Sequence, residues 1–195
     1  MKAAEPIELL SRALDQSECV IAGVRPEQGA LPTPCRSWEV DRLLGHLLDD
    51  LRQFTARAAG GEATYGAPQA VEPGESARAA FRTGADGLLA AWNAAGELTG
   101  TVRLPGMGEV PARFPVDQQI TELAVHTWDL AVATGQPTDL DPEVGETALA
   151  WGQGVLRPQF RGDEASGRVF GPEVATWEDA PVYDRLAAFY GREPA

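Results

Sequence analysis

Several common features are missing from this chain of 195 residues. It has no run of about 18 apolar residues, the length that a membrane-spanning helix needs, so we expect no membrane partner. The N-terminal stretch carries Glu8, Arg12 and Asp15 where a secretory signal needs an uncharged apolar core. We therefore expect a cytoplasmic protein, and its length suits one domain with a small appendage.

Positive charge and cysteine are both scarce. Sixteen basic residues against twenty-nine acidic ones give a net charge of -13, and such a surface repels phosphate backbones, so nucleic acid is not an expected partner. The two cysteines, Cys19 and Cys35, lack the spacing of a CxxC pair. In a reducing cytosol we expect two free thiols, with a disulfide or a metal role for Cys35 as the alternative.

The apolar residues repeat with a helical period over most of the chain. This period predicts helices over 6–24, 38–59, 75–95, 117–134, 142–157 and 181–190, with a β-hairpin over 100–116. We expect Ser37, Asp117 and Asp141 to cap helix N-termini, and Gly84 and Gly87 to allow close helix packing. The pattern predicts an all-α four-helix bundle over 1–160, with a small β-hairpin, and a short C-terminal helical extension over 161–195, packed on the same domain.

Histidine is also scarce, and both copies stand in notable positions. Glu122 precedes His126 by four residues, which puts the two side chains on one helical face about a turn apart. His46 borders the apolar stripe of another predicted helix, so all three can point into the bundle. Two histidines and a carboxylate form a three-ligand metal site with an open position. The alternative is a surface Glu122–His126 pair with His46 as a structural residue.

Two carboxylates accompany the histidines along their helices. Asp129 follows His126 by three residues and Asp50 follows His46 by four, so either can accept a hydrogen bond from an imidazole N–H and fix its tautomer. The alternative for both is a solvated helix charge. For Trp38 and Trp128 we expect core packing rather than a place in a pocket.

Two segments carry a family resemblance. Residues 34–47, Pro-Cys-Arg-Ser-Trp-Glu-Val-Asp-Arg-Leu-Leu-Gly-His-Leu, and 122–131, Glu-Leu-Ala-Val-His-Thr-Trp-Asp-Leu-Ala, resemble the metal motifs of DinB/YfiT-like proteins. The closest resemblance is to the N-terminal domain of mycothiol-dependent maleylpyruvate isomerases, and the tail over 179–192 resembles a compact actinobacterial branch of that family. The resemblance implies a DinB-like bundle and a metal held by His46, Glu122 and His126.

The resemblance also implies a function. Zinc is the expected metal, nickel or iron would accept the same ligands, and mycothiol is a possible cosubstrate. The leading hypothesis is a metal-dependent enzyme that activates a low-molecular-weight thiol, as an isomerase or S-transferase. The alternatives are a non-catalytic metal-binding module or sensor and, more weakly, a metal-dependent hydrolase. The family's isomerases carry a further C-terminal domain, for which about forty residues after the fifth helix are too few. A homodimer is possible.

Overall fold

The computed structural model describes residues 5–36, 38–61, 68–104, 107–162, 170–177 and 179–194. It is mostly helical, with one two-stranded antiparallel sheet, as the sequence predicts. In chain order the elements are α1 (Pro6–Ala22), η1 (Pro26–Gln28), α2 (Val40–Ala58), α3 (Glu75–Ala95), β1 (Thr101–Leu104), β2 (Gly108–Pro111), α4 (Phe114–Thr134), α5 (Pro142–Val155), η2 (Pro158–Phe160) and α6 (Val182–Phe189).

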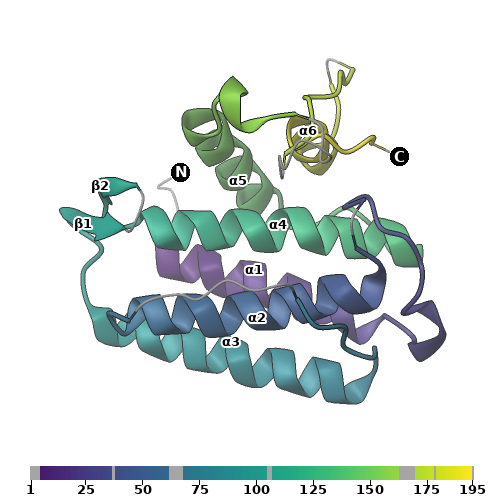
Figure 1. Cartoon of the computed structure of the whole chain (residues 1–195), viewed down its shortest axis with the longest axis horizontal. Coiled ribbons are helices and arrows are strands. Elements are labelled where there is room, and N and C mark those ends of the chain that lie inside the picture. The colour runs from purple at the N-terminus through teal and green to yellow at the C-terminus, as the bar shows by residue number, and fades with distance from the viewer. Residues whose placement is uncertain are drawn as a thin grey trace.

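Helices α1 to α4 lie side by side as a four-helix bundle (Figure 1). In the bundle α2 packs on α3 and α4, and α1 packs on α3 and α4. Helices α5 and α6 pack on each other and on α4, on the side of α4 away from α3. The β-hairpin joins α3 to α4 at one end of the bundle. No helix among the described residues is both long and apolar enough to cross a membrane.

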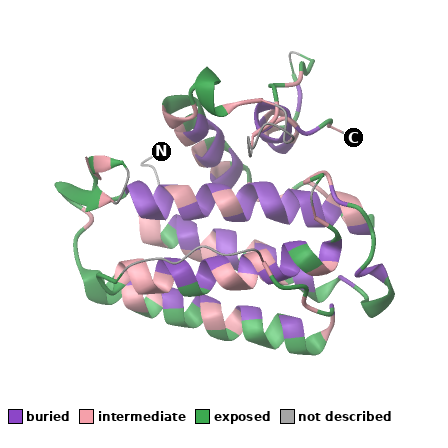
Figure 2. Cartoon of the chain, in the orientation of Figure 1, coloured by how far each residue is buried: buried purple, intermediate pink, exposed green. Residues whose placement is uncertain are grey.

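Helix α4 is enclosed by neighbours on both sides. Its residues are buried along nearly its whole length, whereas α3 exposes one face to solvent (Figure 2). This burial includes polar side chains that a helix on the bundle surface would expose. His126 keeps 6% of its exposure and Asp129 keeps none. Because a buried charge is costly unless it is paired, each of these groups requires a partner inside the fold.

The helix ends show which of the predicted caps form. Asp141 caps α5 as expected, because its side chain accepts hydrogen bonds from the backbone N–H groups of Glu143 and Val144. The prediction for Asp117 is wrong: α4 begins three residues earlier, at Phe114, and Asp117 pairs with Arg113 at 2.7 Å. Pro115 lies in the first turn of α4, where the fixed φ of proline is favourable, and this favours the earlier start.

Helix α2, in contrast, starts later than predicted, at Val40 rather than Trp38. Glu39 forms an isolated antiparallel β-bridge with Pro32, and this extended pairing holds the chain before Val40 out of the helix. The predicted cap, Ser37, lies outside the described residues. Neither Cys19 nor Cys35 forms a disulfide bond.

Of the two glycines within α3, only Gly84 permits close packing. A Cβ added at Gly84 would lie 2.9 Å from Cδ1 and 3.3 Å from Cβ of Leu51 on α2, whereas one at Gly87 would have no atom within 4 Å. The prediction made from the sequence therefore holds for one glycine and not for the other.

We expect Gly87→Ala to stabilise the protein by about 0.5–1 kcal/mol, because alanine loses less entropy than glycine in a helix. Gly84→Ala gains the same entropy but overpacks against the buried Leu51, which typically costs about 1–3 kcal/mol. The difference between the two variants in urea-induced unfolding measures the contact. If the two variants had equal free energies of unfolding, Leu51 and α2 would have moved to admit the new methyl group without loss of stability.

Candidate metal centre

On helix α2, His46 follows Gly45, a position where the neighbouring chain leaves no room for a side chain. A Cβ on Gly45 would lie 1.6 Å from the carbonyl oxygen of Gln69, so the chain around Gln69 passes directly against α2. That segment is fixed to α2 by the N–H of Val71, which donates to the carbonyl of Asp41. The Gly-His pair in the sequence thus has a structural reason: glycine admits the crossing segment, and the next residue turns towards α4.

The structure brings His46, Glu122 and His126 together between α2 and α4. Oε2 of Glu122 lies 3.4 Å from Nε2 of His126 and 3.9 Å from Nε2 of His46. One ligand atom from each of the three residues lies within 4.8 Å of the others. The imidazole rings meet edge to face, with centroids 4.9 Å apart. Glu122 therefore lies between two ring nitrogens that both face it.

Asp129 lies behind His126, on the side away from Glu122. Its Oδ2 is 2.9 Å from Nδ1 of His126, which leaves Nε2 of that ring to face Glu122. The other partner of Asp129 is Arg192, which follows α6: Nε donates to Oδ1 at 3.2 Å and Nη2 donates to Oδ2 at 2.9 Å. Nη1 of Arg192 donates to the carbonyl of Tyr190. The chain after α6 therefore neutralises a carboxylate buried in α4.

Asp50 takes a different position from Asp129. Its Oδ2 lies 3.5 Å from Nε2 of His46, the nitrogen that faces Glu122, rather than behind the ring. Asp50 therefore does not orient His46 from the far side, as Asp129 does for His126. It instead adds a second buried carboxylate beside the nitrogen that would bind a metal.

The charges around Glu122 shift the pKa values of the whole group. Burial alone would raise the pKa of Glu122, but the two histidines outweigh burial and hold it well below the usual range. Burial lowers the pKa of His46, which favours the neutral ring. Burial would also lower the pKa of His126, but its bonds to Asp129 and Glu122 raise it to about 9. Burial and the charge of Glu122 raise the pKa of Asp50 to about 8.

Nε2 of His46 is buried and makes no hydrogen bond with the described residues. A buried ring nitrogen aimed at a carboxylate and a second imidazole is a fitting metal donor, because these are the ligand types of zinc. A second group, Cys35 with His126 and Asp129, also brings its ligand atoms within 4.8 Å. In that group Asp129 is already engaged by both His126 and Arg192.

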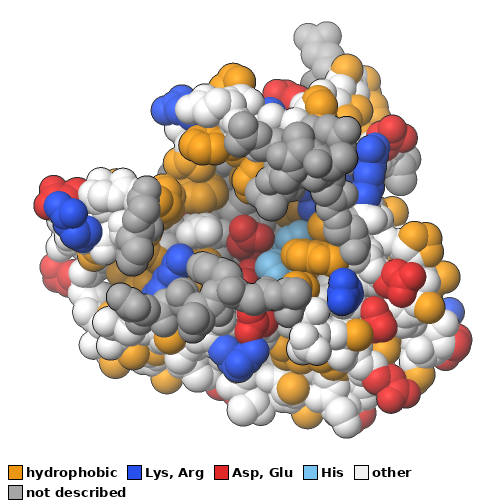
Figure 3. All heavy atoms as spheres, viewed as in Figure 1, with side chains coloured by type: hydrophobic (Ala, Val, Ile, Leu, Met, Phe, Trp, Pro, Cys, Tyr) orange, Lys and Arg blue, Asp and Glu red, His pale blue; other side chains and the backbone are white. Residues whose placement is uncertain are grey.

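The three residues line a cavity of about 510 Å3. The view in Figure 3 shows the histidine side chains in pale blue within a hollow, beside acidic and hydrophobic side chains. Glu122 keeps 31% of its side-chain exposure because it borders this space. The remaining walls come from Cys35, Trp38, Met107, Phe114, Gln118, Thr121, Val125, Trp151, Val155, Leu156, Phe160, Phe170, Tyr190 and Arg192.

Two features of the cavity escape the sequence pattern. Trp38 lines it, with its ring centroid 4.5 Å from that of His46, so the expectation of core packing holds only for Trp128. Arg192 stands in a short segment after the last helix, where no periodicity marks it as buried. The sequence gives no signal for this contact, because the burial of Asp129, which requires a cation, is visible only in the fold.

Comparison with known proteins adds the family. The model of the mycothiol maleylpyruvate isomerase N-terminal domain matches residues 10–131. Uncharacterized proteins from two strains of Mycobacterium tuberculosis are 36% identical over 188 residues, which are 96% of this chain and 98% of each relative. The fold is similar to the crystal structure of a mutant mycothiol-dependent maleylpyruvate isomerase, with a TM-score of 0.57, 19% identity, and coverage of 77% of this chain and 72% of that one. The chain belongs to the family defined by the mycothiol maleylpyruvate isomerase N-terminal domain.

Proposed function

We propose that this protein binds one divalent metal through His46, Glu122 and His126 and uses it to activate a low-molecular-weight thiol, as a mycothiol-type isomerase or S-transferase. The observation that carries the proposal is the convergence of these three side chains at the wall of a cavity. Family membership supports mycothiol as the thiol.

The donor set fits a metal in chemistry and spacing. Zinc bonds of ~2.0–2.2 Å place neighbouring tetrahedral donors roughly 3.3–3.6 Å apart. The 3.4 Å and 3.9 Å separations around Glu122 are close to that range. Zinc suits two imidazoles and a carboxylate, and nickel or iron would also accept them, so availability contributes to which metal is bound.

A divalent metal at this position would lower the pKa of a bound thiol and so supply a thiolate at neutral pH. The chain's own residues prepare the site for this chemistry. Asp129 holds His126 with Nε2 facing Glu122, and Arg192 holds Asp129 in place. Trp38 packs against His46, with ring centroids 4.5 Å apart, and so restricts the orientation of that ring.

The alternatives differ in what they require of the surroundings. A non-catalytic module would be favoured by a metal site closed over by protein, whereas these three residues border a cavity large enough for a small molecule. A hydrolase would require a spare carboxylate near the site to activate water. Asp50 stands in such a position, but its pKa of about 8 means that it would act as a base only at alkaline pH, so a hydrolase would show its activity there.

His46→Ala tests the ligand set and the function together. The buried leucines of α2 remain, so we expect a folded protein, but removing a direct ligand should weaken metal binding by more than about 100-fold, since even the outer partners of ligands contribute roughly 10–100-fold. Metal-loaded wild-type protein should lower the pKa of mycothiol, followed by ultraviolet thiolate absorbance, and the variant should not.

Asp139→Ala, at an exposed carboxylate outside the cavity, is the matched control and should behave as wild type. A wild-type protein that retains metal but leaves the pKa of mycothiol unchanged would contradict the thiol function and favour the non-catalytic module. Hydrolysis of an ester substrate that depended on Asp50 would instead favour the hydrolase.

The affinity for metal should depend on pH up to about pH 9, well above the usual pKa of a histidine. Without metal, His126 has a pKa of about 9, so at lower pH it holds a proton that the metal must displace. We expect affinity to rise by up to about tenfold per pH unit from about pH 7 to about pH 9 and then to level off. Chelator competition measures the affinity, and calorimetry in two buffers measures the released proton.

Asp129→Asn provides the comparison, because loss of the carboxylate lowers the His126 pKa and moves the plateau to lower pH. Circular dichroism checks that the variant is folded. An affinity that stays constant between about pH 7 and pH 9, with no proton released, would show that His126 is not a ligand.

A further inference from the structure

The cavity wall beside the candidate metal site is aromatic and aliphatic. Phe114 and Trp151 pack edge to face with centroids 5.2 Å apart, and Phe170 packs on Tyr190 at 5.8 Å. Met107, Val155, Leu156 and Phe160 complete this apolar wall. It is assembled from the β-hairpin, α4, α5, η2 and the segments around α6, so five parts of the chain contribute apolar side chains to one space.

With a metal in place of the proton on His126, positive charge on the described side chains of this cavity is limited to one residue. Among its described lining residues Arg192 is the only lysine or arginine, and it keeps 9% of its exposure. Each of its three nitrogens donates a hydrogen bond, two to Asp129 and one to the carbonyl of Tyr190. Its charge is thus matched by Asp129 inside the protein.

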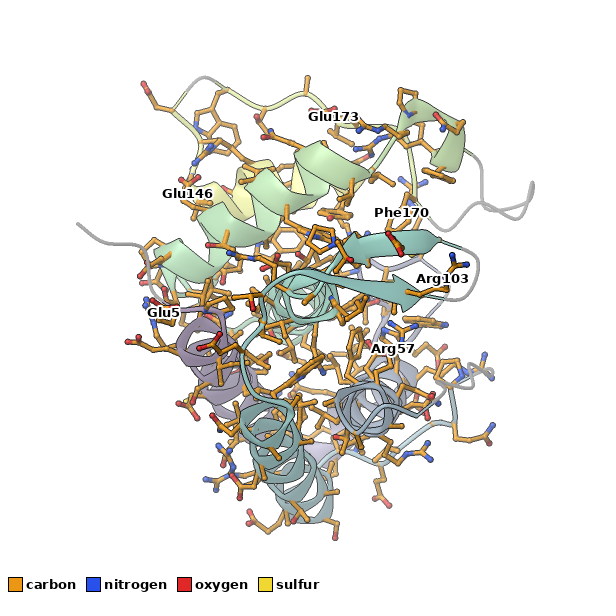
Figure 4. All side chains as sticks on the ribbon, turned by 90° about the vertical axis from the view of Figure 1, so that its left-hand side faces the viewer. Glu5, Arg57, Arg103, Glu146, Phe170 and Glu173 are labelled. Carbon is orange, nitrogen blue, oxygen red and sulfur yellow. The ribbon has the colours of Figure 1, made fainter. Side chains whose placement is uncertain are left out.

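Two arginines near the hairpin, Arg57 and Arg103, are not among the residues that line this cavity, although Nη1 of Arg57 donates to Oε1 of the lining residue Gln118 at 3.3 Å. Arg57 on α2 and Arg103 on β1 line a separate space beside the hairpin (Figure 4). If a divalent metal is bound, Glu122 and an incoming thiolate match its two positive charges. A substrate with two carboxylates would therefore enter a space whose described lining has no lysine or arginine other than the paired Arg192, next to Glu122 and Asp50.

We propose that the second substrate of this site, which receives the thiol, is an uncharged electrophile with an apolar ring and not a dicarboxylate. This inference rests on the proposed thiol function and specifies its substrate class. Apolar pockets bind ligands by burying apolar surface, and aromatic walls favour ring contacts. In a substitution on an arylmethyl chloride, the thiol sulfur forms a bond to carbon, chloride leaves with the electron pair of the broken bond, and the thiol proton passes to solvent.

The test compares unreactive ligands that share a ring and differ in charge. Equilibrium dialysis with metal-loaded protein measures binding of 2-naphthylmethanol, of naphthalene-2,3-dicarboxylate and of maleate. We expect 2-naphthylmethanol to bind at least about tenfold more tightly than either dicarboxylate, because burying an unpaired charge is costly. Tighter binding of a dicarboxylate would overturn the proposal.

Two tryptophan variants form a matched pair. Trp151→Ala removes a wall of the cavity and should weaken 2-naphthylmethanol binding by about tenfold or more, as loss of an aromatic anchor does. Trp177→Ala removes an exposed tryptophan outside the cavity and should have no effect. If Trp151→Ala does not fold, Phe160→Ala on η2 replaces it. Unchanged binding in the folded cavity variant would overturn the proposal.

The result is separable from that of the thiol test. Failure of the thiol function appears as an unchanged mycothiol pKa in metal-loaded protein, whatever naphthyl ligands do. Failure of the substrate class appears as a preference for dicarboxylates in a protein that does lower the thiol pKa. Turnover of 2-(chloromethyl)naphthalene with mycothiol, lost in Trp151→Ala and retained in Trp177→Ala, would support both.

Discussion

The buried pairing of Asp129 with Arg192 is the interaction on which the site depends. Asp129 is fully buried in α4. Burying an ionised carboxylate without a partner would destabilise the fold by about several kcal/mol. Arg192, in the segment after α6, supplies two hydrogen bonds and a compensating positive charge. This pairing favours ionised Asp129, which in turn orients His126 towards Glu122.

The position of α4 explains why such pairing is needed. A helix on the edge of a bundle could turn polar side chains to solvent, but α4 is packed against α1 and α2 on one side and α5 and α6 on the other. Its polar residues are therefore held in a low-dielectric setting, where charges act strongly on one another. The shifted pKa values of Glu122, His126 and Asp50 follow from this enclosure.

The segments after α4 also give the cavity its character. Helix α5, η2 and the chain around α6 provide most of its apolar wall and, in Arg192, the only lysine or arginine among its described lining residues. The four-helix bundle thus supplies His46, Glu122 and His126. The chain after α4 supplies most of the apolar surface and Arg192. The apolar wall and the orientation of His126 both depend on the same C-terminal segment, because Tyr190 lines the cavity and Arg192, two residues later, pairs with Asp129.

The sequence alone predicted the helices and the hairpin, and it supplied the hypothesis of a site made by His46, Glu122 and His126. The helical period of the apolar residues is a local property that does not depend on how the helices pack. A spacing of four residues likewise puts Glu122 and His126 on one helical face whatever surrounds them. The start of α4 was missed because Asp117 is a good cap in isolation, whereas Pro115 and Arg113 favour an earlier turn.

Only the tertiary structure decided the contacts between distant segments. The separation of His46 from Glu122, the approach of Asp50 to the facing nitrogen, the burial of Arg192 and the place of Trp38 on the cavity wall all depend on how helices dock. Local spacing carries no information on docking, because side chains far apart in the chain meet only after apolar faces have packed. The three candidate ligands could therefore be proposed from the sequence, whereas the electrostatics around them, the apolar wall and the roles of Trp38 and Arg192 could not.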